Sequence, residues 1–323
     1  MVGMPRSGTK MLREMLSAHS RISLSVVETH FLPYWIENWE SYGDLSDRRQ
    51  FLDFYAKARR LPYFEDCEAI DEPVITAPEW HARCADFSLQ GVYEALMRYA
   101  TGADADSDVL WGDKTPEYLI HVDALVRLFP NARIVHIVRD ARDQALSSHR
   151  TWGKNMFRAA QRWVDEISEF RRQAARYPFS AIEVRFEDVL NDPGAELRRL
   201  TKFLGLEFEA SMLTVPGQAE PTGAAHGQTS VMSQNQRKYD SQMDRATQRR
   251  IEEIALPVLE IYGYPVPDGL AARPISATGA RWFRLRDGLN ILRGEAEERG
   301  LVGGTRYVLR TLRSQRSRTA DIA

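Results

Sequence analysis

The chain has 323 residues, of which 43% are hydrophobic and 27% are charged, and its formal net charge is −2. This length fits one large domain, or one domain with an insertion. The near-zero net charge creates no global field that would recruit nucleic acid, so we expect no nucleic-acid partner. The two cysteines, Cys67 and Cys84, make neither a disulfide framework nor a metal site of the usual spacing.

The first predicted element is a very short strand at 1–3, followed by a loop suited to an anion and a helix over about 9–18. Gly3 and Gly8 free the loop backbone. Basic and hydroxyl side chains come from Arg6, Lys10, Ser7 and Thr9. Gly3 and Gly8 have the spacing of the glycines in a nucleotide triphosphate P-loop. However, Thr9 stands where that pattern has lysine, and Lys10 stands where it has serine or threonine.

Strands and helices alternate along the rest of the chain. We expect strands at 22–27, 109–111, 133–138 and 181–186, and helices at 116–129, 193–204, 245–262 and in the stretch from 141 to about 177. This order predicts an α/β fold, a P-loop-like parallel sheet flanked by helices. Residues 33–105 are predicted to form a helical insertion, or a cap that faces the acceptor, within a domain spanning 1–270.

Residues 271–323 are predicted to be a basic C-terminal helical extension, in which arginines outnumber acidic residues. Two interpretations of this extension are open. It forms surface helices that pack on the core, or it contacts a partner or an anionic surface such as a membrane.

A second candidate anion site follows the strand at 133–138. This strand delivers Arg139 to the carboxyl edge of the sheet, where ligands bind in open α/β folds. Asp140 is a suitable N-cap for the next helix, and Ser147 lies on the helix face that starts at Asp140. An anion bound there would be held by a guanidinium and a hydroxyl together.

The loop Pro5-Arg6-Ser7-Gly8-Thr9 resembles the 5′-phosphosulfate loop, P-R/K-S-G-T-T, of sulfotransferases that use 3′-phosphoadenosine 5′-phosphosulfate (PAPS). Lys10 departs from that pattern. Arg139 and Ser147 have the spacing of the family's 3′-phosphate ligands. The resemblance runs from residue 2 to about 264. It implies a PAPS-dependent sulfotransferase, of the type that acts on carbohydrates or protein tyrosines, and it implies no metal.

The resemblance also suggests other cofactor contacts. Val184-Arg185-Phe186-Glu187-Asp188 resembles the family's Y-E-D-L segment, with Phe186 in place of the tyrosine near adenine. Ser230 and Lys238 fall where the family has a mobile basic loop over the cofactor.

Catalytic residues are expected at the same sheet edge. Glu28 ends the second strand, where related enzymes place a catalytic glutamate, and it is the preferred general base. His30, two residues on, is the alternative base or a substrate contact. Arg6 and Lys114 are the expected cations at the reacting group, Lys114 because Lys114-Thr115-Pro116 matches a family K-T-P segment.

Two other functions stay open at this stage. A small-molecule kinase with a rearranged P-loop would need Mg²⁺ and a strand-end aspartate, for which Asp140 is the candidate. A nucleotide-binding protein without turnover is the third class. For the sulfotransferase, the acceptor would be a carbohydrate, a glycolipid, a peptide tyrosine or a small alcohol. No signal peptide or membrane span is visible, which predicts a cytoplasmic protein, although the short first strand leaves a clipped start open.

Overall fold

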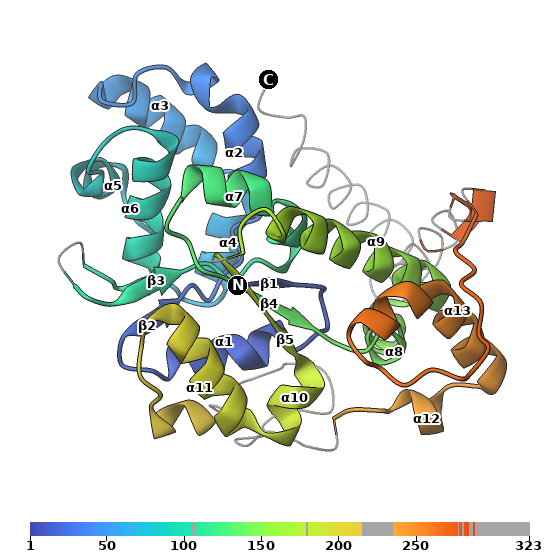
Figure 1. The fold of residues 1–323 in the computed structure, drawn as a ribbon. Coiled ribbons are helices and arrows are strands. Elements are labelled where there is room, and N and C mark those ends of the chain that lie inside the picture. Colours follow the sequence, from blue (N-terminus) through green and yellow to red (C-terminus); the bar gives the residue numbers. More distant parts are fainter. Residues whose placement is uncertain are drawn as a thin grey trace.

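A computed structural model describes residues 1–104, 107–178, 180–214 and 235–276, together with 278–279, 281–283 and 287. Parallel strands lie at the centre, with helices packed on both sides (Figure 1). The strands are β1 (Val2–Gly3), β2 (Ile22–Leu24), β3 (Leu110–Gly112), β4 (Ile134–Val138) and β5 (Ala181–Arg185). The predicted α/β class is confirmed.

The strands form two parallel ladders. The first has the order β1-β4-β5, with Val2 opposite His136 and Val138 opposite Arg185, and the second pairs β2 with β3. β1 lies between the ladders, because the Met1 amino group donates to the Asp113 carbonyl, 2.6 Å away, just after β3. The carboxyl ends of these strands therefore meet at one edge. A cavity of about 700 Å³ is lined by residues of β3 and β4, among them Leu110, Gly112 and Ile134.

The helices around the strands include those predicted, together with two short ones, at 186–191 and 239–242, that were not. They are α1 (Thr9–Ser17), α7 (Val122–Leu128), α8 (Ala141–Trp152), α9 (Met156–Ala174), α10 (Phe186–Asn191), α11 (Pro193–Leu204), α12 (Tyr239–Gln242) and α13 (Arg245–Ile261), with 3-10 turns η2 (Pro116–Ile120) and η3 (Ala210–Leu213). Local chemistry sets several ends: Asp192 caps α11 from Oδ1, and Gly205 ends that helix in the left-handed region.

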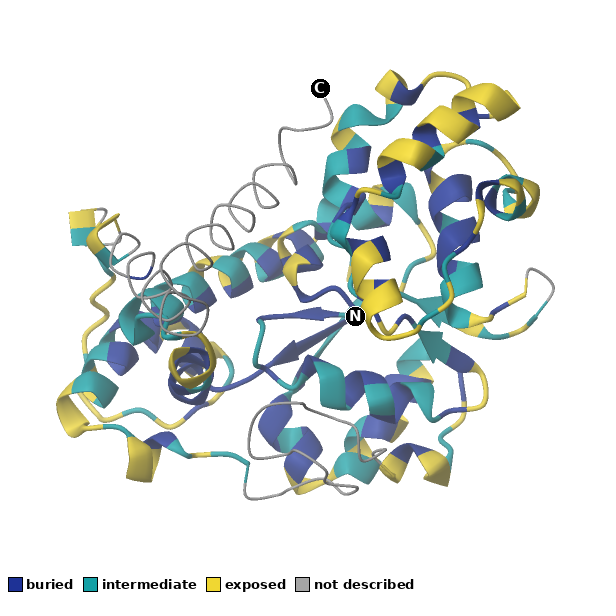
Figure 2. Ribbon diagram, turned by 180° about the vertical axis from the view of Figure 1, so that it is seen from behind, coloured by how far each residue is buried: buried dark blue, intermediate teal, exposed yellow. Residues whose placement is uncertain are grey.

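The insertion at 33–105 is helical, as predicted. It contains α2 (Leu32–Asn38), α3 (Arg48–Ala58), α4 (Pro62–Ala69), α5 (Ala77–Arg83) and α6 (Leu89–Thr101), with the 3-10 turn η1 (Trp39–Tyr42). Its core is aromatic: Trp35 and Trp80 are fully buried, with ring centroids 6.2 Å apart. These helices form a lobe beside the strands, exposed on its outer surface (Figure 2).

Two predicted elements differ in detail. The second strand ends at Leu24, not at 27, because its partner β3 ends at Gly112, and Val26 is 43% exposed beyond the ladder. The helix predicted at 116–129 is divided at His121 into η2 and α7. In the parts of the chain that the structure describes, no helix combines the length and apolar character needed to cross a bilayer. Most of the predicted extension at 271–323 lies outside the described residues.

Candidate active site

The loop between β1 and α1 has an unusual backbone. Arg6 and Gly8 both lie in the left-handed region, with φ of 71° and 90°. A side chain at Gly8 would place its Cβ 2.3 Å from Cδ2 of Phe186, so position 8 requires glycine for space as well as for conformation. The first helical hydrogen bond runs from the Leu12 N–H to the Gly8 carbonyl over 3.0 Å.

The start of α1 is open to an anion. Its N-cap, Gly8, supplies no side-chain oxygen, and the first turn contains no acidic residue. The first N–H groups of a helix have no acceptor within the helix, and they carry partial positive charge. Ser7 is fully buried, and its Oγ has no hydrogen-bond partner among the described residues. Thr9 begins the helix and is 7% exposed.

Residues of α8 lie beside this loop. Arg6 donates from Nε to Ser147 Oγ over 3.2 Å. Arg139 donates from Nη1 to the Arg6 carbonyl over 3.2 Å and from Nη2 to the Asn235 carbonyl over 3.0 Å. The structure therefore brings Arg6, Arg139 and Ser147 together, but Ser147 receives its hydrogen bond from Arg6 and not from Arg139.

Arg139 is held from two further sides. Its guanidinium lies 4.5 Å from the ring centroid of Phe186, and its Nη2 lies 3.7 Å from Oδ2 of Asp143. Its Nε is buried with no hydrogen-bond partner in the described part of the chain. Phe186 is only 2% exposed, because its ring packs under Gly8 and Arg139, and its position near adenine stays a prediction.

Further cations gather at this point. Burial lowers the pKa of Lys238, and the nearby charges of Arg139, Arg150 and Arg6 lower it further, against the opposing effect of Asp143. Lys238 therefore lies near these three arginines, and its contact with the cofactor stays a prediction. Arg150 was missed, although it follows Ser147 by one helical turn and shares its face. Ser230 lies outside the described residues, and Lys10 is half-buried in the first turn of α1.

The predicted catalytic residues meet at the ends of β2 and β3. Lys114 Nζ forms an ion pair with Glu28 Oε1, and His30 Nε2 lies 3.1 Å from Glu28 Oε2. His30 Nδ1 lies 3.1 Å from Oε2 of Glu117 in η2. Lys114 is 6% exposed, whereas the Glu28 side chain is 32% exposed, so Glu28 is accessible to a ligand and its cationic partner is buried.

These contacts shift two pKa values. Burial raises the pKa of Glu28, but the hydrogen bond from His30 and the charge of Lys114 outweigh it, so the pKa lies below its usual value. Burial lowers the pKa of His30, but hydrogen bonds with Glu117 and Glu28 raise it to about 9. At neutral pH Glu28 is therefore an anion and His30 a cation. Glu28 is in the state a proton acceptor needs.

Asp113 organises the residues behind this pair, a role that the sequence analysis missed. Its Oδ2 accepts from Thr29 Oγ1 over 2.7 Å and from the Tyr93 hydroxyl over 2.8 Å. Its Oδ1 accepts from Thr115 Oγ1 over 2.9 Å. Thr29 follows Glu28 and Thr115 follows Lys114, so the Asp113 carboxylate ties together the two backbone segments that carry the ion pair. Its position directly before Lys114 was the available signal.

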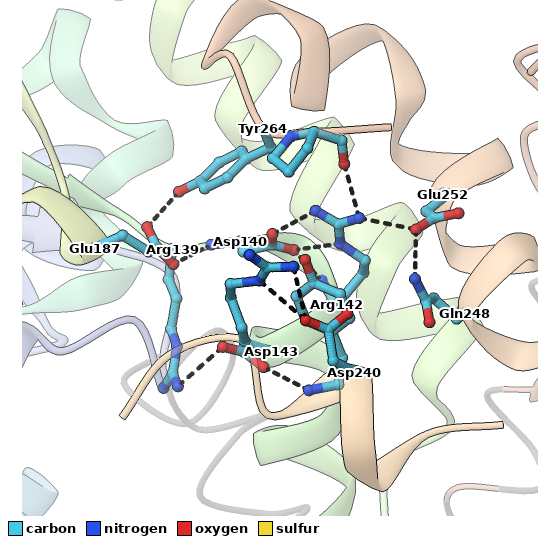
Figure 3. A network of polar contacts seen from close by, with 12 residues as sticks. Arg139, Asp140, Arg142, Asp143, Glu187, Asp240, Gln248, Glu252 and Tyr264 are labelled. Carbon is cyan, nitrogen blue, oxygen red and sulfur yellow. Dashed lines mark hydrogen bonds and ion pairs between the residues drawn. The ribbon is translucent and has the colours of Figure 1, made fainter. Parts of the chain in front are cut away.

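A buried network fixes the other side of the site (Figure 3). Asp140 caps α8, as predicted, by accepting from the Arg142 N–H over 2.9 Å. Arg142 also donates from Nη2 to Asp140 Oδ2 over 2.6 Å and from Nη1 to Glu252 Oε1 over 2.8 Å. Glu187 accepts from the Asp140 N–H over 3.0 Å and from the Tyr264 hydroxyl over 2.8 Å. The Asp140 carboxylate is thus engaged by protein groups, which argues against a Mg²⁺ ligand there.

Comparison with known proteins identifies this arrangement. A family model described as the sulfotransferase family matches residues 1–210. The chain belongs to the sulfotransferase family. Two solved sulfotransferase domains share its fold: one from the curacin biosynthetic pathway, at a TM-score of 0.50, and one from the Synechococcus PCC 7002 olefin synthase, at 0.52. Both are 22% identical to this chain and cover 82% of it, matching 97% and 95% of their own lengths.

Two relatives of this sulfotransferase show how much of a related protein the chain matches. A putative protein-tyrosine sulfotransferase of Caenorhabditis briggsae is 22% identical over 280 residues, covering 81% of this chain and 87% of that protein. An uncharacterized protein of Aquifex aeolicus is 24% identical over 272 residues, covering 80% of this chain but only 31% of that protein. The chain therefore spans less than a third of the Aquifex relative.

Proposed function

We propose that this sulfotransferase uses PAPS and transfers its sulfuryl group to an acceptor hydroxyl, with Glu28 as general base. The observation that carries the proposal is the joined anion site: the uncapped start of α1, Arg6 on Ser147 Oγ, and Arg139 on the Arg6 carbonyl. The buried Ser7 Oγ and Arg139 Nε, both without hydrogen-bond partners in the described chain, fit a ligand rich in acceptor oxygens.

The proposed donor residues divide into two groups. Arg6, Ser7, Gly8, Thr9 and Lys10 form the loop for the 5′-phosphosulfate. Arg139 and Ser147, with Lys238 and Arg150 nearby, suit a second phosphate at the 3′ position, because a guanidinium and a hydroxyl both donate to phosphate oxygens. Ser230 stays a predicted contact. PAPS, when bound, supplies the activated sulfuryl group.

The roles at the acceptor side follow from the Glu28 contacts. Glu28 would accept the proton of the acceptor hydroxyl at a carboxylate oxygen while the hydroxyl oxygen bonds to sulfur. The bond between that sulfur and the 5′-phosphate oxygen of PAPS would break in the same step, and PAP would leave. Protonation neutralises Glu28 and weakens its ion pair with Lys114. The Lys114 ammonium and the Arg6 guanidinium then stabilise negative charge at the reacting group. His30, protonated at neutral pH, keeps Glu28 ionised before the reaction and contacts the substrate.

The acceptor classes remain those predicted: a carbohydrate, a glycolipid, a peptide tyrosine or a small alcohol. The likeness to the protein-tyrosine sulfotransferase of Caenorhabditis briggsae supports a peptide tyrosine as one of them. We also propose that the domain spans 1–270, that no metal and no nucleic acid take part, and that the protein acts in the cytoplasm.

Calorimetric titration with 3′-phosphoadenosine 5′-phosphate (PAP), ATP and GTP tests the donor. We expect PAP to bind most tightly, without Mg²⁺, because only PAP carries the 3′-phosphate. Tighter, Mg²⁺-dependent binding of ATP or GTP would instead support a kinase. Transfer of label from PAPS to a mixed acceptor panel, read by mass spectrometry, then tests turnover. PAP binding with no sulfated product from any acceptor would indicate a binding protein.

A further inference from the structure

An exposed tryptophan lies beside the anion-binding loop. Trp152 is the last residue of α8 and is 39% exposed. The Arg6 guanidinium lies 5.9 Å from its ring centroid, and the Lys154 ammonium lies 4.2 Å from that centroid. The chain reverses between the two at Gly153, which has a φ of 63°. Two cationic side chains therefore contact the indole ring, and one of them, Arg6, belongs to the proposed donor loop.

Lys154 is the unbalanced charge of this region. Arg158 pairs with the buried Asp287, 2.5 Å away, and Arg162 pairs with Glu166. Unlike these two arginines, Lys154 makes no ion pair with any of the residues that the structure describes. Burial lowers the pKa of Lys154, and Arg162 and Arg158 lower it further, while Glu117 and Asp287 oppose this effect. A half-buried ammonium among guanidinium groups favours an incoming anion.

The position of Lys154 is on the acceptor side of the site. A small cavity of about 40 Å³ runs from Met4 and Pro5, at the start of the loop, to Trp152, Lys154, Arg158 and Arg162. In the other direction, Lys154 interacts electrostatically with Glu117, which lies 3.1 Å from His30, and His30 lies 3.1 Å from Glu28. Lys154 and Trp152 thus line a cavity that begins at the donor loop, and Lys154 is within electrostatic reach of Glu117, the neighbour of His30.

We propose that Lys154 and Trp152 form an acceptor subsite that binds a negatively charged group of the acceptor against the ammonium and its ring or chain against the indole. This proposal rests on the proposed function and specifies its substrate class, an anionic hydroxyl compound. A neutral acceptor would leave Lys154 half-buried among guanidinium groups without an ion-pair partner of its own, whereas an anionic acceptor supplies one.

The test compares two probes that differ only in charge, 4-hydroxyphenylacetate and its methyl ester. Their dissociation constants are measured by calorimetry on the full chain with PAP bound. We expect the acid to bind about fivefold to twentyfold more tightly than the ester at low salt, and this preference to shrink at high salt. Lys154→Gln should abolish the preference, and Lys154→Arg should retain most of it.

A matched control separates this effect from a general loss of charge. Lys57 also lies over an aromatic ring, 5.7 Å from the Tyr42 centroid, but in the insertion, so Lys57→Gln should leave the preference intact. Equal affinity of wild type for acid and ester, no binding of either, or a preference that survives Lys154→Gln would overturn the proposal. A weakened PAP affinity in Lys154→Gln would also overturn it and assign Lys154 to the donor. Failure of the proposed function would appear separately, as wild type that does not bind PAP.

Discussion

Arg6 and Ser147 are 141 residues apart in sequence and are joined by a 3.2 Å hydrogen bond from Nε to Oγ. This contact links the loop after β1 to the helix after β4, so the two predicted anion sites are one continuous site. A substitution in the loop or in the helix should therefore weaken donor binding. The size of the effect should depend on whether the ligand carries the 3′-phosphate.

Arg139→Ala tests the 3′-phosphate assignment. The variant should bind PAP more weakly by about 2–3 kcal/mol, because a hydrogen-bonded charge partner of the phosphate is lost. Adenosine 5′-phosphosulfate lacks that phosphate and should lose far less affinity. Calorimetry with both ligands measures the difference, and Arg249→Ala, at a surface arginine of α13, serves as control. An equal loss for both ligands would show that Arg139 does not contact the 3′-phosphate.

Glu28→Gln tests the general base. Glutamine keeps the shape of the side chain but cannot take a proton, so the turnover rate should fall by roughly 10²–10⁴. PAP affinity should stay near that of wild type, because Glu28 lies on the acceptor side. Glu260→Gln, at an exposed residue of α13, should leave both quantities unchanged. Near-normal turnover in Glu28→Gln would transfer the role to His30 or to water.

The raised pKa of His30 predicts a pH-dependent stability. The pKa rises from 6.5 to about 9 on folding, so the native state holds this proton more tightly than the unfolded chain. The contribution is fully present below pH 6.5 and is lost as the pH rises through about 9. Urea titration measures the free energy of unfolding of wild type and of His30→Asn at each pH. The amount by which wild type is more stable than His30→Asn should fall by on the order of 1 kcal/mol across this window. A difference that stays constant from neutral pH to pH 9 would contradict the assigned contacts.

Gly8→Ala tests the fit of the loop against Phe186. The new Cβ would lie 2.3 Å from the ring at a φ of 90°, so clash and backbone strain should together destabilise the protein by about 2–4 kcal/mol. Gly102→Ala is the matched control, because Gly102 has a φ of 65° and no atom within 4 Å of its added Cβ. It should show the strain alone, about 1 kcal/mol. Equal losses of unfolding free energy in the two variants would mean that Phe186 yields to the new methyl group.

Lys10→Thr tests the residue that departs from the family pattern. If Lys10 faces the anion, as we predict, its replacement should weaken PAPS binding at low salt by roughly threefold to tenfold, and high salt should reduce this difference. Lys202→Thr, near the end of α11, provides a control for net charge. Unchanged PAPS affinity and rate at low salt would leave Arg6 as the working cation of the loop.

Elements that a local pattern determines could be predicted from the sequence. The loop, α1, β4 and the Asp140 cap each depend on neighbouring residues, and the structure has them as predicted. Contacts that depend on distant partners could not be predicted in this way. The split of 116–129 at His121 lets Glu117 contact His30 and Tyr118 contact Thr29, and nothing in the local pattern indicates these partners.

The same reason explains the missed site residues. Asp113 is identified by the hydroxyls that converge on it, and two of these, from Thr29 and Tyr93, come from other segments of the chain. Arg150 becomes part of the site only because Lys238 and Arg139 fold beside it. The pairing of Glu28 with Lys114 likewise joins residues that lie 86 positions apart.

The position of β1 has a consequence for synthesis on the ribosome. Its ladder partner is β4, with Val2 opposite His136, so the first strand emerges long before the strand that it pairs with. At 5–20 residues per second, this delay is on the order of ten seconds. Throughout that interval β4 is not available to pack against the apolar face of α1. This face is therefore exposed on the nascent chain, where a chaperone can bind it. Ribosome-bound chains stopped before and after residue 138 should therefore differ in how readily a protease cuts the loop at Arg6.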